Sequence, residues 1–182
     1  MTADITTHDQ ILKAALVLFA DKGYDATSMR EIAQQVDISK PALYYHFDSK
    51  EEILRALVDE SIPLIDELLD WAKQQTPSPK VRKEAFNRWA DIVQRNGLLG
   101  FRFVSANRSA VAAVLGKRRG QLGAISELGQ ILKSPDGPDD QELRICMSLL
   151  ALNTAGWIAI NLDTPEEEIL LQARKIAIKL MP

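Results

Sequence analysis

The chain contains one cysteine, Cys146, and two histidines, His8 and His46, among its 182 residues. A single cysteine excludes an internal disulfide, and two widely separated histidines do not form the ligand set of a zinc site. The patterns HExxH, CxxC, GxSxG and GxGxxG are also absent. The sequence therefore predicts a protein that is not an enzyme and that uses no metal or cofactor.

Alternating runs of apolar and polar residues, which would predict β-strands, are missing as well. Apolar residues recur at spacings of three and four instead, which predicts an all-α fold. The first ten residues carry neither an apolar signal core nor an arginine-rich transit pattern, so we expect a cytoplasmic protein. Residues 145–162 are uncharged, but their polar Asn153 and Asn161 disfavour a membrane span and favour a buried helix.

The chain has no excess of basic residues. Its formal net charge is -3, and residues 1–55 hold six Lys and Arg against nine Asp and Glu, whereas residues 56–182 hold sixteen of each sign. Proteins that bind nucleic acids usually carry a basic surface. Any affinity for DNA must therefore come from a few locally placed cations.

What the sequence does contain is a pair of short helices with separate caps. Ser28 and Glu31 form a capping box at the start of the first helix. Asp37 suits a left-handed turn, Ser39 is a second N-cap, and Pro41 fits the first turn of the next helix. Two short helices joined by four residues have the layout of a helix-turn-helix, which points to DNA binding.

The second of these helices is expected to have an inward and an outward side. Leu43 and Phe47 are four residues apart and face the first helix, which leaves basic and aromatic side chains pointing outward. Such a helix can enter the major groove of DNA. Another cap at Ser49 predicts a further helix, and Lys50 in its first turn is expected to contact a phosphate.

Residues 11–54 resemble the DNA-binding region of the TetR family of transcriptional repressors, through ILKAALVLFADKGYDATSMREIA and SKPALYYHFDSKEEIL. Asp37 departs from the glycine that is usual in this turn. The domains implied are a helix-turn-helix domain at 1–48, a connecting helix at 49–62, and a helical ligand-binding and dimerisation domain at 63–182. The predicted contacts to operator DNA are Thr27, Ser28, Arg30, Ser39, Lys40, Pro41, Ala42, Tyr44, Tyr45, His46 and Lys50.

The resemblance also implies a homodimer formed through the last two helices. One chain has too little protein to cover both faces of the apolar segment 145–162, and a second copy would cover the rest. Small side chains permit close approach of another helix. The predicted interface residues are Ser148, Ala151, Ala155, Ala159, Leu170, Ala173 and Ala177.

The family usually encloses a small-molecule effector among its middle helices. The candidate lining residues are Trp71, Phe86, Trp89, Phe101, Phe103, Met147 and Trp157, with Arg102, Asn107 and Asn153 as polar anchors. Aromatic residues at helical spacing are more often plain core. Arg102 is equally well explained as a surface arginine on an amphipathic turn.

Two functions remain after this survey. The leading hypothesis is a dimeric repressor that binds a pseudo-palindromic operator and leaves it when a small effector binds. The alternative is an architectural or adaptor protein that binds DNA and needs no effector.

Overall fold

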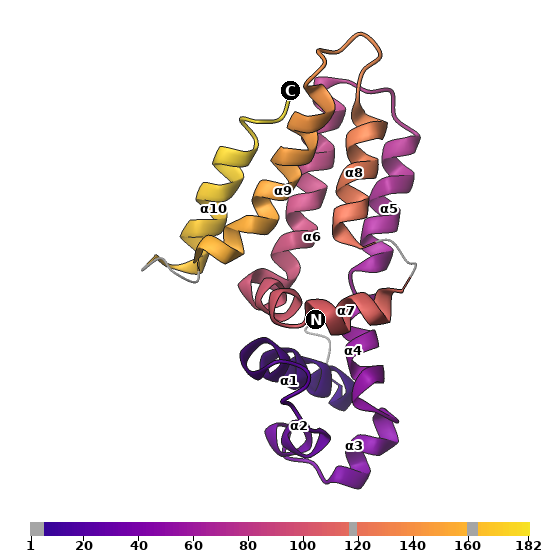
Figure 1. The fold of residues 1–182 in the computed structure, drawn as a ribbon, viewed down its shortest axis with the longest axis vertical. Helices are drawn as coiled ribbons and strands as arrows, with labels where there is room; N and C mark the ends of the chain where they lie inside the picture. The colour runs from indigo at the N-terminus through magenta and orange to yellow at the C-terminus, as the bar shows by residue number, and fades with distance from the viewer. Residues whose placement is uncertain (1–5, 117–119, 160–163) are drawn as a thin grey trace. The chain divides into compact units, whose positions relative to one another are not determined.

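The computed structural model describes residues 6–116, 120–159 and 164–182, and the regular elements in these ranges are all α-helices (Figure 1). The predicted all-α fold is confirmed. The helices are α1 Thr7–Lys22, α2 Met29–Gln35, α3 Lys40–His46, α4 Lys50–Asp59, α5 Ile62–Lys73, α6 Pro79–Ala106, α7 Arg108–Leu115, α8 Gln121–Leu132, α9 Gln141–Ala159 and α10 Glu166–Ala177.

These helices form two compact units that are not continuous in sequence. The N-terminal unit combines the residues up to Glu60 with Arg102–Gly116, and the C-terminal unit combines Ser61–Phe101 with the residues after Gly116. The predicted domains at 1–48, 49–62 and 63–182 were continuous. The difference arises because α7 packs on α4 and thereby joins the end of α6 to the N-terminal helices.

The core of the N-terminal unit is built from one apolar stripe on each helix. Ile11 and Phe19 of α1, Ile32 of α2 and Leu43 of α3 are completely buried. Phe47, just after α3, is 3% exposed. Leu43 and Phe47 therefore face inward as predicted, and α2 packs on α1 while α3 packs on α2.

Local hydrogen bonds explain where the short helices begin and end. Ser28 and Glu31 form the predicted reciprocal capping box, and the Ser39 hydroxyl accepts a hydrogen bond from the Ala42 amide. Asp37 has φ 58°, the left-handed conformation predicted for this turn. Gly23, at φ 86°, ends α1 as expected.

Two predicted caps differ in the structure. The Ser49 hydroxyl accepts a hydrogen bond from the Glu52 amide, but the Glu52 carboxylate accepts from the Asp48 amide instead of closing a capping box. Thr164 was expected to cap the last helix. The N-cap position is Pro165, which has no side-chain donor or acceptor, so α10 begins without a side-chain cap.

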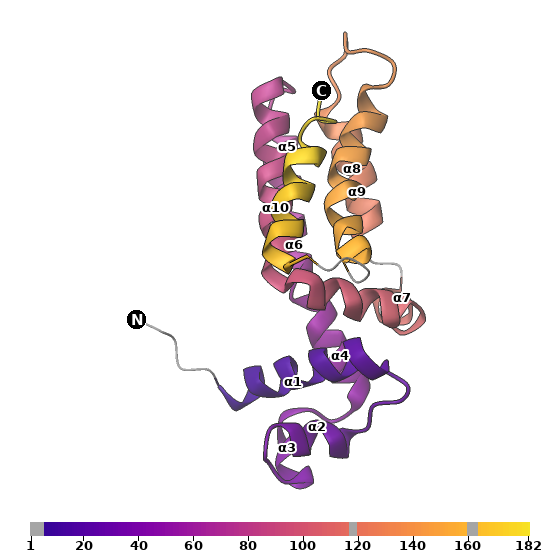
Figure 2. The ribbon, with the colours of Figure 1, turned by 90° about the vertical axis from the view of Figure 1, so that its left-hand side faces the viewer.

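The C-terminal unit is a bundle of α5, the larger part of α6, α8, α9 and α10, which run alongside one another (Figure 2). Its core contains Phe86 and Trp89 of α6, Leu128 of α8 and Leu149 of α9. Gly129 permits α8 to approach α9 closely, since a Cβ at this position would collide with the Cys146 sulfur. Burial raises the pKa of the Cys146 thiol, in keeping with its predicted role as a small apolar side chain.

Glycine and proline mark the interruptions between these helices. Helix α4 ends at Asp59, and Pro63 lies in the first turn of α5, where a backbone N–H would have no partner within the helix. The glycine-rich stretch 109–133 is divided by Gly116, at φ 56°, between α7 and α8. Gly97 breaks α6 with φ 54° and ψ −154°, a conformation that is essentially restricted to glycine.

The uncharged segment 145–162 lies in α9 as far as Ala159. Ile145, Leu149 and Leu152 are buried, whereas Met147 is 50% exposed. In the described part of the chain, no helix combines the length and apolar character that a membrane crossing requires. The segment is thus a bundle helix with one uncovered face, not a helix surrounded on all sides by its own chain.

Candidate nucleic-acid interface

The outward side of α3 presents aromatic and basic groups to solvent. Tyr45 is 88% exposed and Tyr44 is 42% exposed. The Lys40 ammonium lies 5.7 Å from the centre of the Tyr44 ring, and the His46 ring lies 5.5 Å from that of Tyr45. Because Leu43 and Phe47 fix the opposite side in the core, these groups project from a rigid helix. The structure thus brings together the predicted contacts on α3.

Among the predicted DNA contacts around α2, some side chains are exposed and others already form hydrogen bonds within the protein. Arg30 is exposed. The hydroxyls of Ser28 and Ser39 are exposed but are used to cap α2 and α3. Thr27 is only 2% exposed, and its hydroxyl donates to the Gly23 carbonyl at 2.8 Å. Thr27 therefore supports the turn before α2, a position that the sequence pattern did not reveal.

Lys50 also has partners that the sequence did not indicate. Its ammonium donates to the main-chain oxygens of Tyr24 and of Thr27, the latter at 2.7 Å, and it lies 4.2 Å from the centre of the Tyr24 ring. Through Lys50, α4 thus holds the turn between α1 and α2 in place by hydrogen bonds. The phosphate contact of Lys50 stays a prediction, and it would have to form with an ammonium that is already hydrogen-bonded.

Two acidic residues of the N-terminal unit are paired with cations. Arg102 donates to the Asp21 carboxylate, and Lys22 lies 2.9 Å from Glu31. Residues 102–116 contribute Arg102 and Arg108 to this unit and no acidic residue. Residues 56–60 of the same unit add Asp59 and Glu60. The unit therefore keeps the net charge of -3 that residues 1–55 have on their own, with eight Lys and Arg against eleven Asp and Glu.

Glu31 gives the capping of α2 a pH dependence. Hydrogen bonds from Lys22, and then from the amide and hydroxyl of Ser28, lower its pKa to about 2 from an ordinary value of 4.5. A lowered pKa in the folded state stabilises the protein above pH 4.5, and this contribution disappears as the pH falls towards 2.

Glu31→Gln should therefore lower the melting temperature at pH 7 and have almost no effect near pH 2. Glu67→Gln, at an exposed position of α5, is the control and should show no such convergence.

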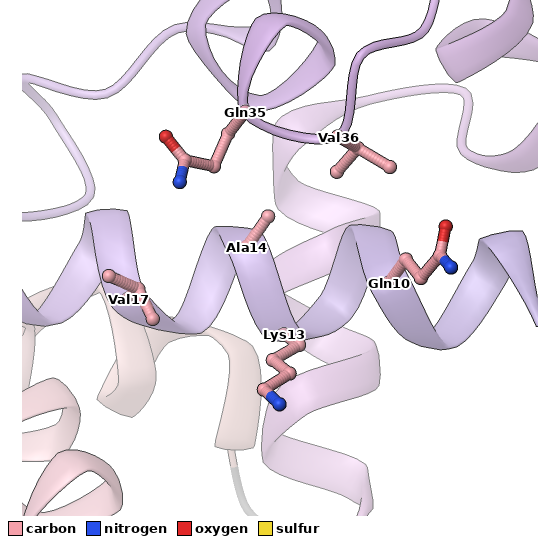
Figure 3. A pocket seen from close by; sticks show the side chains of 6 residues that line it. All are labelled: Gln10, Lys13, Ala14, Val17, Gln35 and Val36. Atoms are coloured by element: carbon pink, nitrogen blue, oxygen red, sulfur yellow. The ribbon is translucent and has the colours of Figure 1, made fainter. Parts of the chain in front are cut away.

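A shallow hollow of about 440 Å³ lies between α1 and α2, and the sequence did not predict it (Figure 3). Gln10, Lys13, Ala14 and Val17 line it from α1, with Gln35 and Val36 opposite. None of these residues belongs to the predicted ligand-binding set. The hollow is open to solvent and lies within the N-terminal unit.

The predicted ligand-binding residues do not form one group. Phe103 is 4% exposed and its ring lies 6.3 Å from that of Phe19, while Asn107 is also 4% exposed. Phe103 and Asn107 belong to the N-terminal unit, as does Arg102. Phe101 belongs to the C-terminal unit. The family's use of its middle helices suggested a ligand site here, but Arg102, Phe103 and Asn107 contact α1 instead.

Three members of that set do meet in the C-terminal unit. Trp89 is completely buried and donates its indole N–H to the Asn153 side-chain oxygen at 3.1 Å. Asn153 in turn donates to Gln121, also at 3.1 Å. Phe86 is 1% exposed in the same cluster. These contacts form one chain of uncharged polar groups across an apolar core.

The other predicted ligand residues lie at the margin of this cluster. Trp71 is half-buried, with the Arg88 guanidinium 4.2 Å from its ring centre. Met147 points to solvent. The side chain of Trp157 lies outside the described residues, as does that of Ala159 from the predicted dimer interface.

Two of the residues assigned to the dimer interface, Ser148 and Ala177, contact each other within one chain. Ser148 is completely buried and its hydroxyl donates to the Ala177 carbonyl at 2.8 Å, while Ala177 is itself buried. These residues allow α10 of the same chain to approach α9. Ala155 is buried too, and Ala151, Leu170 and Ala173 are half-buried. The uncovered apolar side chains are larger ones: Leu143, Met147 and Leu150 of α9, with Leu171 and Ile176 of α10.

The N-terminal part of the chain is similar in sequence to bacterial regulators. Residues 11–57 match the model described as "Bacterial regulatory proteins, tetR family". Over 51 residues, the chain is 49% identical to the biofilm operon icaADBC HTH-type negative transcriptional regulator IcaR of Staphylococcus epidermidis, covering 28% of each chain. IcaR of Staphylococcus aureus strain Newman is 53% identical over 45 residues, or 24% of its length. The chain therefore matches about a quarter of the length of these relatives.

Solved structures resemble nearly the whole chain. AibR in complex with isovaleryl coenzyme A and operator DNA has a TM-score of 0.63 at 21% identity, covering 97% of this chain and 99% of AibR. The TetR family regulator PfmR of Thermus thermophilus has a TM-score of 0.61 at 23% identity, covering 95% and 97%. At such identities the likeness establishes the fold, with a helix-turn-helix at its N-terminus and helices after it.

Proposed function

We propose that this chain, whose residues 11–57 match the tetR family of bacterial regulatory proteins, is a transcriptional repressor that acts in the cytoplasm by binding operator DNA through α3. The observation that carries the proposal is the exposed row of Lys40, Tyr44 and Tyr45 on a helix whose other side is buried. The curated relatives named above are negative regulators, which favours repression over activation.

We further propose that two copies assemble through α9 and α10. Leu143, Met147 and Leu150 recur at spacings of four and three on α9 and are exposed. Leu171 and Ile176 are exposed on α10, which packs on α9. Apolar side chains clustered in this way mark an interaction surface. A twofold dimer would place two α3 helices about 34–36 Å apart, one turn of DNA, on a pseudo-palindromic operator.

Regulation by a small effector is the third part of the proposal. AibR was solved with both isovaleryl coenzyme A and operator DNA, so an effector is plausible for a chain of the same fold. The cluster around Trp89 and Asn153 is the proposed binding region. An effector that releases DNA must bind the DNA-free form more tightly. It should therefore raise the melting temperature and weaken operator binding, and a compound library that yields no such molecule would favour the alternative of an effector-independent DNA-binding protein.

Selection of bound sequences from random DNA tests the core of this proposal. The expected result is an inverted repeat whose half-sites are one helical turn apart, bound more tightly than random DNA at physiological salt. Binding of all sequences with equal affinity would contradict the proposed function. The selected operator also supplies the duplex for the measurements below.

Lys40→Ala should change which bases are preferred. If Lys40 reaches a guanine edge, its loss costs about 1–3 kcal/mol at that base pair and relaxes the preference there. Lys73→Ala is the control, since it removes one positive charge from an exposed position of α5. Repeating the selection with both variants provides the measurement. An unchanged operator logo for Lys40→Ala would show that Lys40 does not read a base.

A further inference from the structure

The turn that connects α1 to α2 is held in place by side chains from other helices. Residues 23–27 lie outside the helices. Within the turn, the Thr27 amide donates to the Tyr24 carbonyl at 3.2 Å. The Lys50 ammonium, from the first turn of α4, donates to the main chain at Tyr24 and Thr27. Asn107, between α6 and α7, also forms a hydrogen bond with the main chain of this turn.

Asn107 uses its whole side-chain amide on this region. Its oxygen accepts the Tyr24 amide N–H, and its nitrogen donates to the carbonyls of Phe19 at 2.9 Å and of Phe103 at 2.7 Å. Phe19 lies in the last turn of α1, and its carbonyl also accepts the Gly23 amide, so Asn107 adds a second hydrogen bond at the end of α1 from outside the helix. Asn107 also occupies the N-cap position of α7, where asparagine is favoured, yet it makes no capping hydrogen bond there.

Residues that precede Asn107 at the end of α6 also contact α1. The Phe103 ring faces Phe19, whose ring lies 5.4 Å from that of Tyr24. Arg102 pairs with Asp21 in the last turn of α1. Residues 102–107 thus contact the end of α1 and the turn after it through aromatic packing, an ion pair and the amide hydrogen bonds of Asn107.

The turn matters for DNA binding because it leads directly into the helix-turn-helix. Thr27 precedes Ser28, the N-cap of α2, and α2 packs on α3. A change in the turn therefore alters the direction of α2 relative to α1. Because α3 packs on α2, the orientation of α3 changes as well. We propose that Asn107 is a positioning residue for DNA binding, which fixes α2 and α3 relative to α1 without touching DNA.

This inference rests on the proposed function, and the test uses the operator obtained by selection. Asn107→Ala should weaken operator binding about tenfold, comparable to a mismatched base pair, while affinity for random DNA stays within about twofold because phosphate contacts are little affected by small reorientations. Hydrogen exchange at the Tyr24 amide should accelerate in the same variant. Binding is measured well below the melting temperature of each protein, with circular dichroism confirming that it is folded.

Two further variants separate positioning from a general loss of stability. Asn107→Ser retains a residue that is favoured at the N-cap of α7, so this variant should remain folded. The short serine hydroxyl cannot replace the two N–H donors of the Asn107 side chain, so the variant should still lose operator preference. Val111→Ala removes buried packing from α7 and leaves Asn107 intact, so it should lower the melting temperature without changing the ratio of operator to random affinity.

The possible failures can be told apart. If wild-type protein prefers no sequence, the proposed function is wrong. If wild-type protein has a clear operator and both Asn107 variants retain the full preference, only the positioning role is overturned. Equal losses of preference in Asn107→Ala and Val111→Ala would also overturn it, because the effect would then follow α7 stability.

Discussion

Met147→Glu is expected to convert the protein from a dimer to a monomer and to weaken operator binding by about a hundredfold or more. Met147 is half exposed between Leu143 and Leu150 on α9. At a twofold interface, the substitution would bury two carboxylates among apolar side chains, which is strongly unfavourable. A dimer binds its second half-site at a high effective concentration, and a monomer loses this advantage.

Light scattering and operator titration measure the two parts of this prediction. Gln130→Glu, on an exposed position of α8, adds the same charge and should remain dimeric with unchanged DNA affinity. A Met147→Glu protein that is still dimeric would place the interface elsewhere. A monomeric variant with full operator affinity would show that each copy binds DNA independently.

Trp89→Ala is expected to cause the largest loss of folding stability, about 3–5 kcal/mol. Trp89 is completely buried in the core of the C-terminal unit, so its removal leaves a large cavity. It also deprives the Asn153 oxygen of its indole donor. Since whole proteins are stable by only about 5–15 kcal/mol, this variant should unfold at a much lower temperature.

Urea unfolding followed by circular dichroism checks this value. Trp71→Ala provides a matched control, because Trp71 is only half-buried at the margin of the same core, with the Arg88 guanidinium over its ring. Its expected loss is about 1 kcal/mol, from partial burial and one cation–π contact. Equal losses for the two tryptophans would contradict the assignment of Trp89 to the centre of the core.

Local sequence was sufficient where short-range chemistry decides the structure. The cap of α2, the left-handed Asp37 and the N-cap Ser39 were all predicted, since each depends on residues only a few positions apart. The exposed face of α3 was also predictable, because Leu43 and Phe47 lie four residues apart and fix its inward side. These features rest on helical periodicity and on hydrogen-bonding capacity, which a sequence displays directly.

The interface residues of α9 show where such reasoning fails. Ser148 and Ala177 were expected to contact a second copy, but they contact each other within one chain. A row of small residues indicates that some helix approaches closely and does not specify which helix. The choice depends on packing between α9 and α10, and it leaves the larger Leu143, Met147 and Leu150 uncovered.

By itself, the sequence determined the helix-turn-helix and the all-α fold, since caps and apolar spacing are local properties. Only the tertiary structure decided that residues 102–116 belong with the first sixty residues, where Asn107 donates to the Phe19 carbonyl and Arg102 pairs with Asp21. It likewise placed the Lys50 ammonium on the carbonyls of Tyr24 and Thr27. These contacts join groups from about 23 to 88 positions apart. Such pairings depend on how the chain packs, which periodicity along one helix cannot encode.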